Sequence, residues 1–159
     1  MNGRSAIAVA LALLAVGTTR IAGASELIGR PAVESGDTLR FGAVRVRLAG
    51  IEAPHAGSDC TLAGAPFDCA RIAATALMDL TVGAAVQCRP VDAGADEPPG
   101  GVVVARCEAD GYDLSEGMTY TGWARAWPAE TSIYRIFETR ARAQRHGLWR
   151  AGISPPGSW

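Results

Sequence analysis

The chain contains no lysine, so its basic side chains are arginines and two histidines. Within residues 25–159, 13 arginines are outnumbered by 16 acidic residues, which gives a formal charge of −3. Affinity for a polyanion comes largely from cations that displace its counterions, so this balance argues against strong non-specific binding of nucleic acid. Any phosphate-binding role must depend on a local cluster of arginines and not on the field of the whole molecule.

The chain also lacks an apolar run long enough to span a bilayer. The longest run, Ala6–Val16, has 11 residues, whereas a membrane helix needs about 20. It follows one cationic residue and precedes the small-residue pattern Ala22-Gly23-Ala24, an arrangement typical of a secretory signal. We therefore predict that residues 1–24 are a signal peptide and that the protein is exported, to a periplasm or out of the cell. An uncleaved membrane anchor is the alternative.

The mature part, residues 25–159, has the length of one ordinary domain and is large enough to bury a core without oligomerisation. A single domain and a monomer are therefore expected. All four cysteines lie in this part, and an even count in an exported chain favours two disulfides over a metal site. Four cysteines allow three pairings. Cys88 and Cys107 lie on two apolar runs expected to form a hairpin, and pairing them leaves Cys60 with Cys69.

Apolar and basic side chains alternate along Val44–Ile51, the period-two pattern of a half-buried strand, with Arg45 and Arg47 on one face. The same reasoning predicts further strands at Glu26–Val33, around Leu39 and Phe41, and in the apolar runs 85–88 and 102–107. Between the last two runs, Pro90–Gly101 is rich in proline, glycine and acidic residues. This composition predicts a mobile loop.

Apolar residues at helical spacing and capping signals predict helices over Asp68–Leu80, Asp113–Thr121 and Thr131–His146. Asp68 is the expected N-cap of the first helix, Asp113 begins a capping box, and Gly147 is the expected C-terminal cap of the last. Strands followed by helices, without repeated strand-helix-strand alternation, indicate an α+β domain built on a small Greek-key barrel.

Two stretches, Val33–Arg40 and Val44–His55, resemble the signature of the staphylococcal nuclease (thermonuclease-like) family. In that signature a Gly-Asp-Thr turn and an Arg-Leu-x-Gly-Ile-Asp-x-Pro-Glu strand converge on one phosphodiester. The resemblance extends through Gly122–Ala126 and Tyr134–Trp149, and so covers nearly the whole mature chain. It implies a five-stranded Greek-key OB-fold barrel with about three helices, and Ca²⁺-dependent hydrolysis of DNA or RNA.

The family binds Ca²⁺ through paired carboxylates. Asp37, in the Gly-Asp-Thr turn, matches the first of them, and Glu52 stands where the second is usually Asp. Ser35 replaces an acid that the family often has two positions before Asp37. The alternatives need no metal, because Asp37 could hydrogen-bond its own turn and Glu52 could be a solvated acid at a strand end.

Arg47 matches the first phosphate-binding arginine of the family, and its planar fork can hold two phosphate oxygens. The alternative is a strand arginine paired with Asp37 or Glu52. The second arginine of the family is missing, since Val102 stands at its position. Arg106 lies beyond that position, on a face that the sequence leaves undetermined.

His55 stands where the family has its glutamate general base. A neutral imidazole could act as a base, and together with Asp37 and Glu52 it could hold Mn²⁺ or Zn²⁺ in place of Ca²⁺. A surface histidine without a role is the alternative. The aromatic side chains of the second half could stack on bases, although core packing is the commoner role for Trp123, Trp127, Tyr134 and Trp149.

Three hypotheses follow. The one we favour is an exported domain whose Ca²⁺-dependent phosphodiesterase site is partly lost, with weak or no activity, and which binds a phosphate-bearing or protein ligand. The second is an active, atypical nuclease for DNA or RNA that uses a divalent metal with Asp37, Glu52, Arg47 and His55. The third is a structural or interaction module of the envelope that binds a partner through the barrel edge or the Pro90–Gly101 loop.

Overall fold

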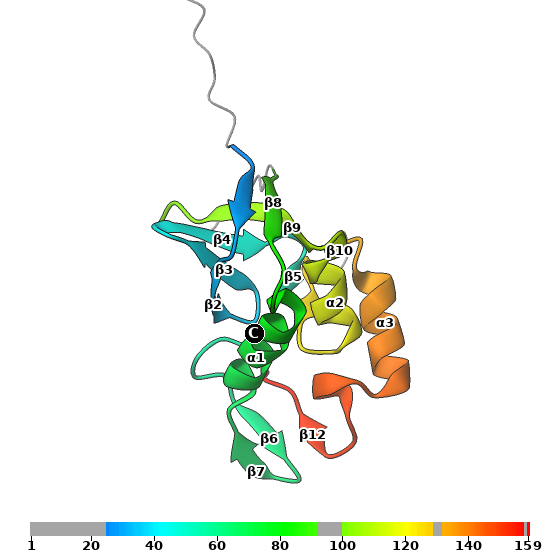
Figure 1. Ribbon diagram of the computed structural model, residues 1–159. Coiled ribbons are helices and arrows are strands. Elements are labelled where there is room, and N and C mark those ends of the chain that lie inside the picture. The colour runs from blue at the N-terminus through cyan, green and yellow to red at the C-terminus, as the bar shows by residue number, and fades with distance from the viewer. Residues whose placement is uncertain (1–24, 92–99, 129–131, 158) are drawn as a thin grey trace, which may run out of the picture.

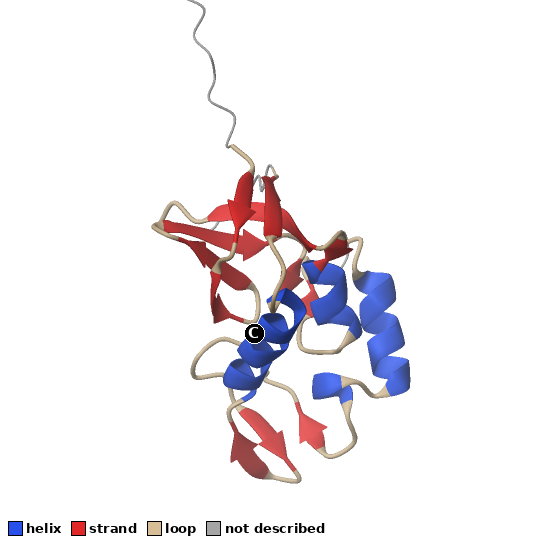
Figure 2. Cartoon of the chain, in the orientation of Figure 1, coloured by secondary structure: helices blue, strands red, loops and turns tan. Residues whose placement is uncertain are grey.

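The computed structural model describes residues 25–91, 100–128, 132–157 and 159. It is an α+β structure with a curled mixed sheet and three α-helices in this part of the chain (Figures 1 and 2). The predicted signal peptide, residues 1–24, lies outside the described residues. Within the described part of the chain, no helix has the length and apolar character needed to cross a membrane.

The main sheet has the strand order β1-β8-β9-β4-β3-β2, and β10 also pairs with β9. Its strands are β1 (Leu27–Gly29), β2 (Ala32–Ser35), β3 (Thr38–Phe41), β4 (Val44–Leu48), β8 (Val86–Pro90), β9 (Val103–Ala109) and β10 (Tyr112–Asp113). All neighbours are antiparallel except β4 and β9, which run parallel. β1 and β2 stand at opposite ends of this order, yet only Arg30 and Pro31 separate them in the chain. The sheet therefore curls strongly (Figure 1).

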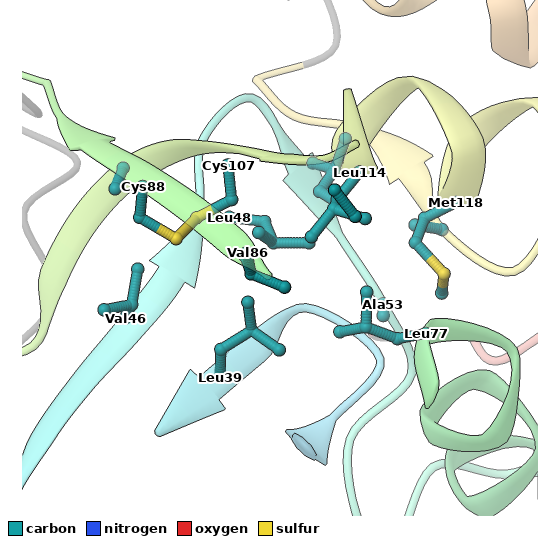
Figure 3. Close-up of a cluster of buried hydrophobic side chains, with 14 of the residues drawn as sticks. Leu39, Val46, Leu48, Ala53, Leu77, Val86, Cys88, Cys107, Leu114 and Met118 are labelled. Carbon is teal, nitrogen blue, oxygen red and sulfur yellow. A yellow bond between two sulfur atoms is a disulfide. The ribbon is translucent and has the colours of Figure 1, made fainter. Parts of the chain in front are cut away.

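The alternation predicted for Val44–Ile51 is seen in the second half of β4, where Val46 and Leu48 are buried and Arg47 between them lies on the other face, whereas Val44 at the start of the strand is 37% exposed. Two helices close the core on the inner side of the sheet, α1 (Cys69–Thr81) and α2 (Leu114–Tyr120). Figure 3 shows Leu77 of α1 and Met118 of α2 among the strand side chains of this core.

The predicted N-caps of the first two helices are confirmed. The Asp68 carboxylate accepts the Arg71 backbone N–H at 2.9 Å, and the Asp113 carboxylate accepts that of Glu116 at 3.1 Å. An unpaired N–H at a helix start is costly, which explains why short acidic side chains begin both helices.

The third helix, α3 (Arg135–Gln144), is shorter than predicted. Its predicted first residue, Thr131, lies outside the described residues. At the other end the helix stops at Arg145, which adopts a left-handed conformation with φ +57°. Gly147 does not cap α3. It begins the short 3₁₀ helix η2 (Gly147–Trp149), and it is glycine because a Cβ there would clash with the Gly122 backbone.

Two small sheets complete the fold. β5 (Ile51–Glu52) pairs with β11 (Arg125–Ala126) directly after the β4 turn. A separate sheet of β6 (Cys60–Leu62), β7 (Ala65–Phe67) and β12 (Ile153–Ser154) lies below α1 in Figure 1. The sequence analysis missed this second sheet, because its strands of two or three residues are too short to show a periodic pattern.

Both predicted disulfides are present, Cys60–Cys69 and Cys88–Cys107. Cys88 and Cys107 face each other across the β8–β9 ladder, as the hairpin argument predicted, and both are fully buried. Two disulfides are consistent with an exported protein, because such bridges persist in oxidising compartments.

We expect the double replacement Cys88→Ala with Cys107→Ala to lower the free energy of unfolding by about 3 kcal/mol. The bridge closes a loop of 19 residues, and its removal returns that conformational freedom to the unfolded chain. Urea denaturation followed by tryptophan fluorescence measures the change. The pair Cys60→Ala with Cys69→Ala, which opens a loop of nine residues, should cost slightly less. An unchanged midpoint in both double variants would show that the bridges do not stabilise the fold.

Candidate functional site

A cavity of about 240 Å³ lies beside the turn that joins β4 to β5. Residues 47–51 form one wall. Val91, Val104 and Arg106 form the second, and the third comes from Trp127, Pro128 and residues 132–134. The cavity is thus assembled from segments that are distant in sequence, and it contains one of the predicted site residues, Arg47.

Gly50 holds these walls together. Its carbonyl accepts the Trp127 backbone N–H at 2.9 Å and the Ser132 hydroxyl at 2.6 Å. Its φ is +76°, and an added Cβ would lie 2.8 Å from the Tyr134 ring. Both the backbone conformation and the close ring contact require glycine here, which gives the Arg-Leu-x-Gly-Ile motif a structural reason.

Arg47 and Arg106 project from the same face of the main sheet into the cavity. In the parallel β4–β9 pairing Arg47 lies opposite Val104, two residues before Arg106. The intervening Ala105 and the following Cys107 point into the core. Because side chains alternate along a strand, Arg106 shares the outer face with Arg47.

Neither cavity arginine forms an ion pair with a carboxylate among the residues that the structure describes. The sequence alternative in which Arg47 pairs with Asp37 or Glu52 is therefore wrong. Arg45, two residues earlier on the same strand, does have a partner and lies 2.6 Å from Glu34. Arg47 and Arg106 thus bring two uncompensated positive charges to one cavity.

The two hydroxyl groups of the cavity wall already donate hydrogen bonds within the protein. The Ser132 hydroxyl donates to the Gly50 carbonyl, and the Tyr134 hydroxyl donates to the Asp113 carboxylate at 2.8 Å. Burial, reinforced by that hydrogen bond, raises the pKa of Tyr134 to about 12. The phenol is therefore neutral at neutral pH and adds no negative charge to the cavity.

Asp37 ties together the backbone around its own turn. Its Oδ1 accepts the hydroxyls of Ser35 and Thr38 at 2.8 and 2.9 Å, and its Oδ2 accepts the Ala53 backbone N–H at 3.2 Å. The preceding Gly36 packs so closely that an added Cβ would lie 2.8 Å from the Ala53 Cβ. The Gly-Asp-Thr turn is thereby pinned against the segment that follows β5.

Glu52 forms an ion pair that the sequence analysis did not foresee. Its Oε2 accepts two hydrogen bonds from Arg125, at 2.6 Å from Nη2 and 3.0 Å from Nε. The Arg125 guanidinium also lies over the Trp127 ring at 4.8 Å and the Trp159 ring at 5.2 Å. Arg125 is directly opposite Glu52 in the β5–β11 pairing, a relation that only the folded chain creates.

His55 lies on an exposed loop and does not line the cavity. Its backbone N–H donates to the Ser58 hydroxyl at 3.1 Å, and its Nδ1 lies 3.3 Å from the same oxygen. In the described ranges no three histidine, cysteine or acidic side chains converge on a point where a metal ion could be held. Val102, at the position of the missing family arginine, immediately precedes β9.

Comparison with known proteins adds no relative. No model of a known protein family matches the chain, and neither does any curated protein. The resemblance to the staphylococcal nuclease family therefore stays a prediction from the sequence motifs. A function has to be argued from the cavity and its residues.

We expect Glu52 and Arg125 to stabilise the fold as a pair. Glu52→Ala and Arg125→Ala should each lower the free energy of unfolding, and the double variant should cost about 1 kcal/mol less than the two added together. The pair is mostly buried, with side chains 20% and 28% exposed, so water screens it little. Urea unfolding of the four proteins measures this coupling.

The pair Arg89 and Glu108, at 3.5 Å and with side chains 55% and 31% exposed, is the control for that cycle. Its coupling should be close to zero, because exposed pairs contribute little. Equal coupling in the two cycles would contradict a special role for Glu52 and Arg125.

We also expect stability to fall at high pH because of Tyr134. Its pKa is higher in the folded chain than the ordinary value of 10, so the stability it contributes is present below pH 10 and is lost as the pH rises towards 12. Tyr134→Phe should remove this part of the pH dependence and, by deleting a hydrogen bond, cost about 1 kcal/mol at pH 8. Urea unfolding at pH 8 and pH 11 tests both effects. Tyr120→Phe, at an exposed tyrosine, should retain the steep fall, and an identical fall in Tyr134→Phe would contradict the assignment.

Proposed function

We propose that this domain binds a phosphate-bearing ligand between Arg47 and Arg106 and does not hydrolyse it efficiently. The observation that carries the proposal is the pair of arginines that face one cavity without a carboxylate partner in the described structure. A guanidinium without a protein partner can give all its donors to a bound anion.

The chemistry of arginine favours phosphate as that anion. Each guanidinium presents a planar fork of donors that matches two phosphate oxygens, and two forks together neutralise a doubly charged group. The neutral Tyr134 does not oppose such a ligand. Because the chain as a whole is acidic, affinity for phosphate is confined to the cavity. This agrees with the expectation that phosphate binding depends on a local cluster of arginines.

We further propose that the curled sheet is a five-stranded OB-type barrel, as the resemblance to the staphylococcal nuclease family implies. The support is the short link between β1 and β2, which pair with β8 and β3 respectively. If β1 and β2 count as one bent strand, the strand order returns to its start. The parallel pairing of β4 with β9 then lies between two antiparallel halves.

The residues present do not fit the calcium ion that this resemblance implies. Calcium takes six to eight oxygen ligands, whereas Asp37 already accepts three hydrogen bonds from its own surroundings and Glu52 holds Arg125. His55, at the position of the general base, does not line the cavity. These contacts favour binding over hydrolysis, and no step of a hydrolytic mechanism follows from them.

Titration of the protein from Ser25 with inorganic phosphate and pyrophosphate, measured by calorimetry at low ionic strength, tests the site. We expect binding that weakens about ten- to a hundredfold in Arg47→Ala and in Arg106→Ala, the usual effect of losing one charged hydrogen-bond donor. Arg45→Ala is the matched control, because Arg45 lies on the same strand but pairs with Glu34, and it should bind as the wild type does. Absence of binding in the wild type would refute the proposal and favour the envelope module. An equal loss in Arg45→Ala would also refute it.

Incubation with single-stranded DNA and RNA tests the nuclease alternative. With Ca²⁺, Mn²⁺ or Zn²⁺ we expect no cleavage above that of the chelator control. Metal-dependent cleavage that disappears in both Arg47→Ala and His55→Ala would overturn this expectation and establish the atypical nuclease.

A further inference from the structure

Large apolar side chains surround the two cavity arginines. Val91, Trp127 and Ile133 line the cavity and are 39%, 38% and 62% exposed. We call Val91, Trp127 and Ile133 the apolar rim. Exposed apolar side chains that gather beside one site mark a contact surface.

The other lining residues also offer few groups that could recognise a polar ligand. Val104 contributes apolar surface, whereas the side chains of Leu48 and Ile51 are buried in the core. The hydroxyl protons of Ser132 and Tyr134 are committed to Gly50 and Asp113. Among the described lining residues, the free side-chain donors are therefore those of the two arginines and the Trp127 indole N–H, and no carboxylate or amide side chain lines the cavity to pair with the edge of a nucleobase.

We propose that the ligand is a small phosphate monoester with an apolar substituent. Its phosphate lies between Arg47 and Arg106, and its apolar group covers Trp127 and Ile133. This inference rests on the proposed function and names the class of ligand for the same site. A phosphate monoester carries close to two negative charges at neutral pH, which the two guanidiniums match, and the apolar group removes the exposed rim from water.

A series of alkyl phosphates tests the proposal. The protein from Ser25 is titrated with inorganic phosphate and with ethyl, butyl and octyl phosphate, the last below its micelle concentration, and with adenosine monophosphate. We expect affinity to rise by up to about fourfold for each methylene that becomes buried, until the rim is covered. Octyl phosphate should bind more tightly than the nucleotide, because no carboxylate or amide side chain lines the cavity to pair with the polar edge of the base.

Variants then locate the apolar contact. Ile133→Ser should flatten the dependence of affinity on chain length, measured relative to the variant's own affinity for inorganic phosphate. The Ile133 side chain is 62% exposed, so the fold should tolerate its loss. The control is Ile28→Ser, which removes an equally exposed isoleucine on β1 (66% exposed) that does not line the cavity, and it should retain the full dependence.

Each other outcome has a distinct meaning. Arg47-dependent binding of phosphate without a rise along the alkyl series, or tighter binding of the nucleotide, overturns this inference and leaves the proposed function standing. Binding to anionic phospholipid vesicles without affinity for monomeric octyl phosphate also overturns it, in favour of a membrane surface. No binding of any phosphate refutes the inference and the proposed function together.

Discussion

The Ala49–Gly50 turn is the constraint on which the rest of the site depends. Its backbone makes hydrogen bonds to three other segments. The Ala49 N–H donates to the Ala105 carbonyl of β9, and the Ala49 carbonyl accepts the Ser115 hydroxyl of α2. The Gly50 carbonyl accepts the Trp127 backbone N–H and the Ser132 hydroxyl. The Tyr134 ring packs directly on Gly50, where no Cβ intervenes. One tight turn thus connects the sheet, a helix and the segment before α3, and the cavity is the space left beside it.

The residues of the motif that resembles the nuclease signature make packing contacts and hydrogen bonds that hold the chain around this turn. Gly36 and Asp37 pin the β2–β3 turn, Gly50 admits the Tyr134 ring, and Glu52 holds Arg125 against Trp127. The acidic groups of the motif are therefore occupied by protein partners, whereas the arginines at the cavity are not. This division of charge is the physical basis for proposing that the site binds an anion and does not hydrolyse it.

Features that depend on neighbouring residues were predictable. Asp68 and Asp113 cap their helices because a short acidic side chain can reach an N–H group three residues ahead. The alternation in β4 and the Cys88–Cys107 pairing follow from the period of a strand and from a hairpin. The end of α3 was not predictable in this way, since Gly147 is used for a close approach to Gly122 on a distant segment.

The sequence by itself determined the α+β class and the two disulfides and made Arg47 a candidate site residue, because periodicity, residue counts and the motif are local properties. Only the tertiary structure decided what surrounds that arginine. The parallel register of β4 and β9 brings Arg106 to it, and the β5–β11 pairing joins Glu52 to Arg125 across 73 positions. Such pairings are set by which buried surfaces fit together over the whole chain, and no short stretch of sequence contains that information.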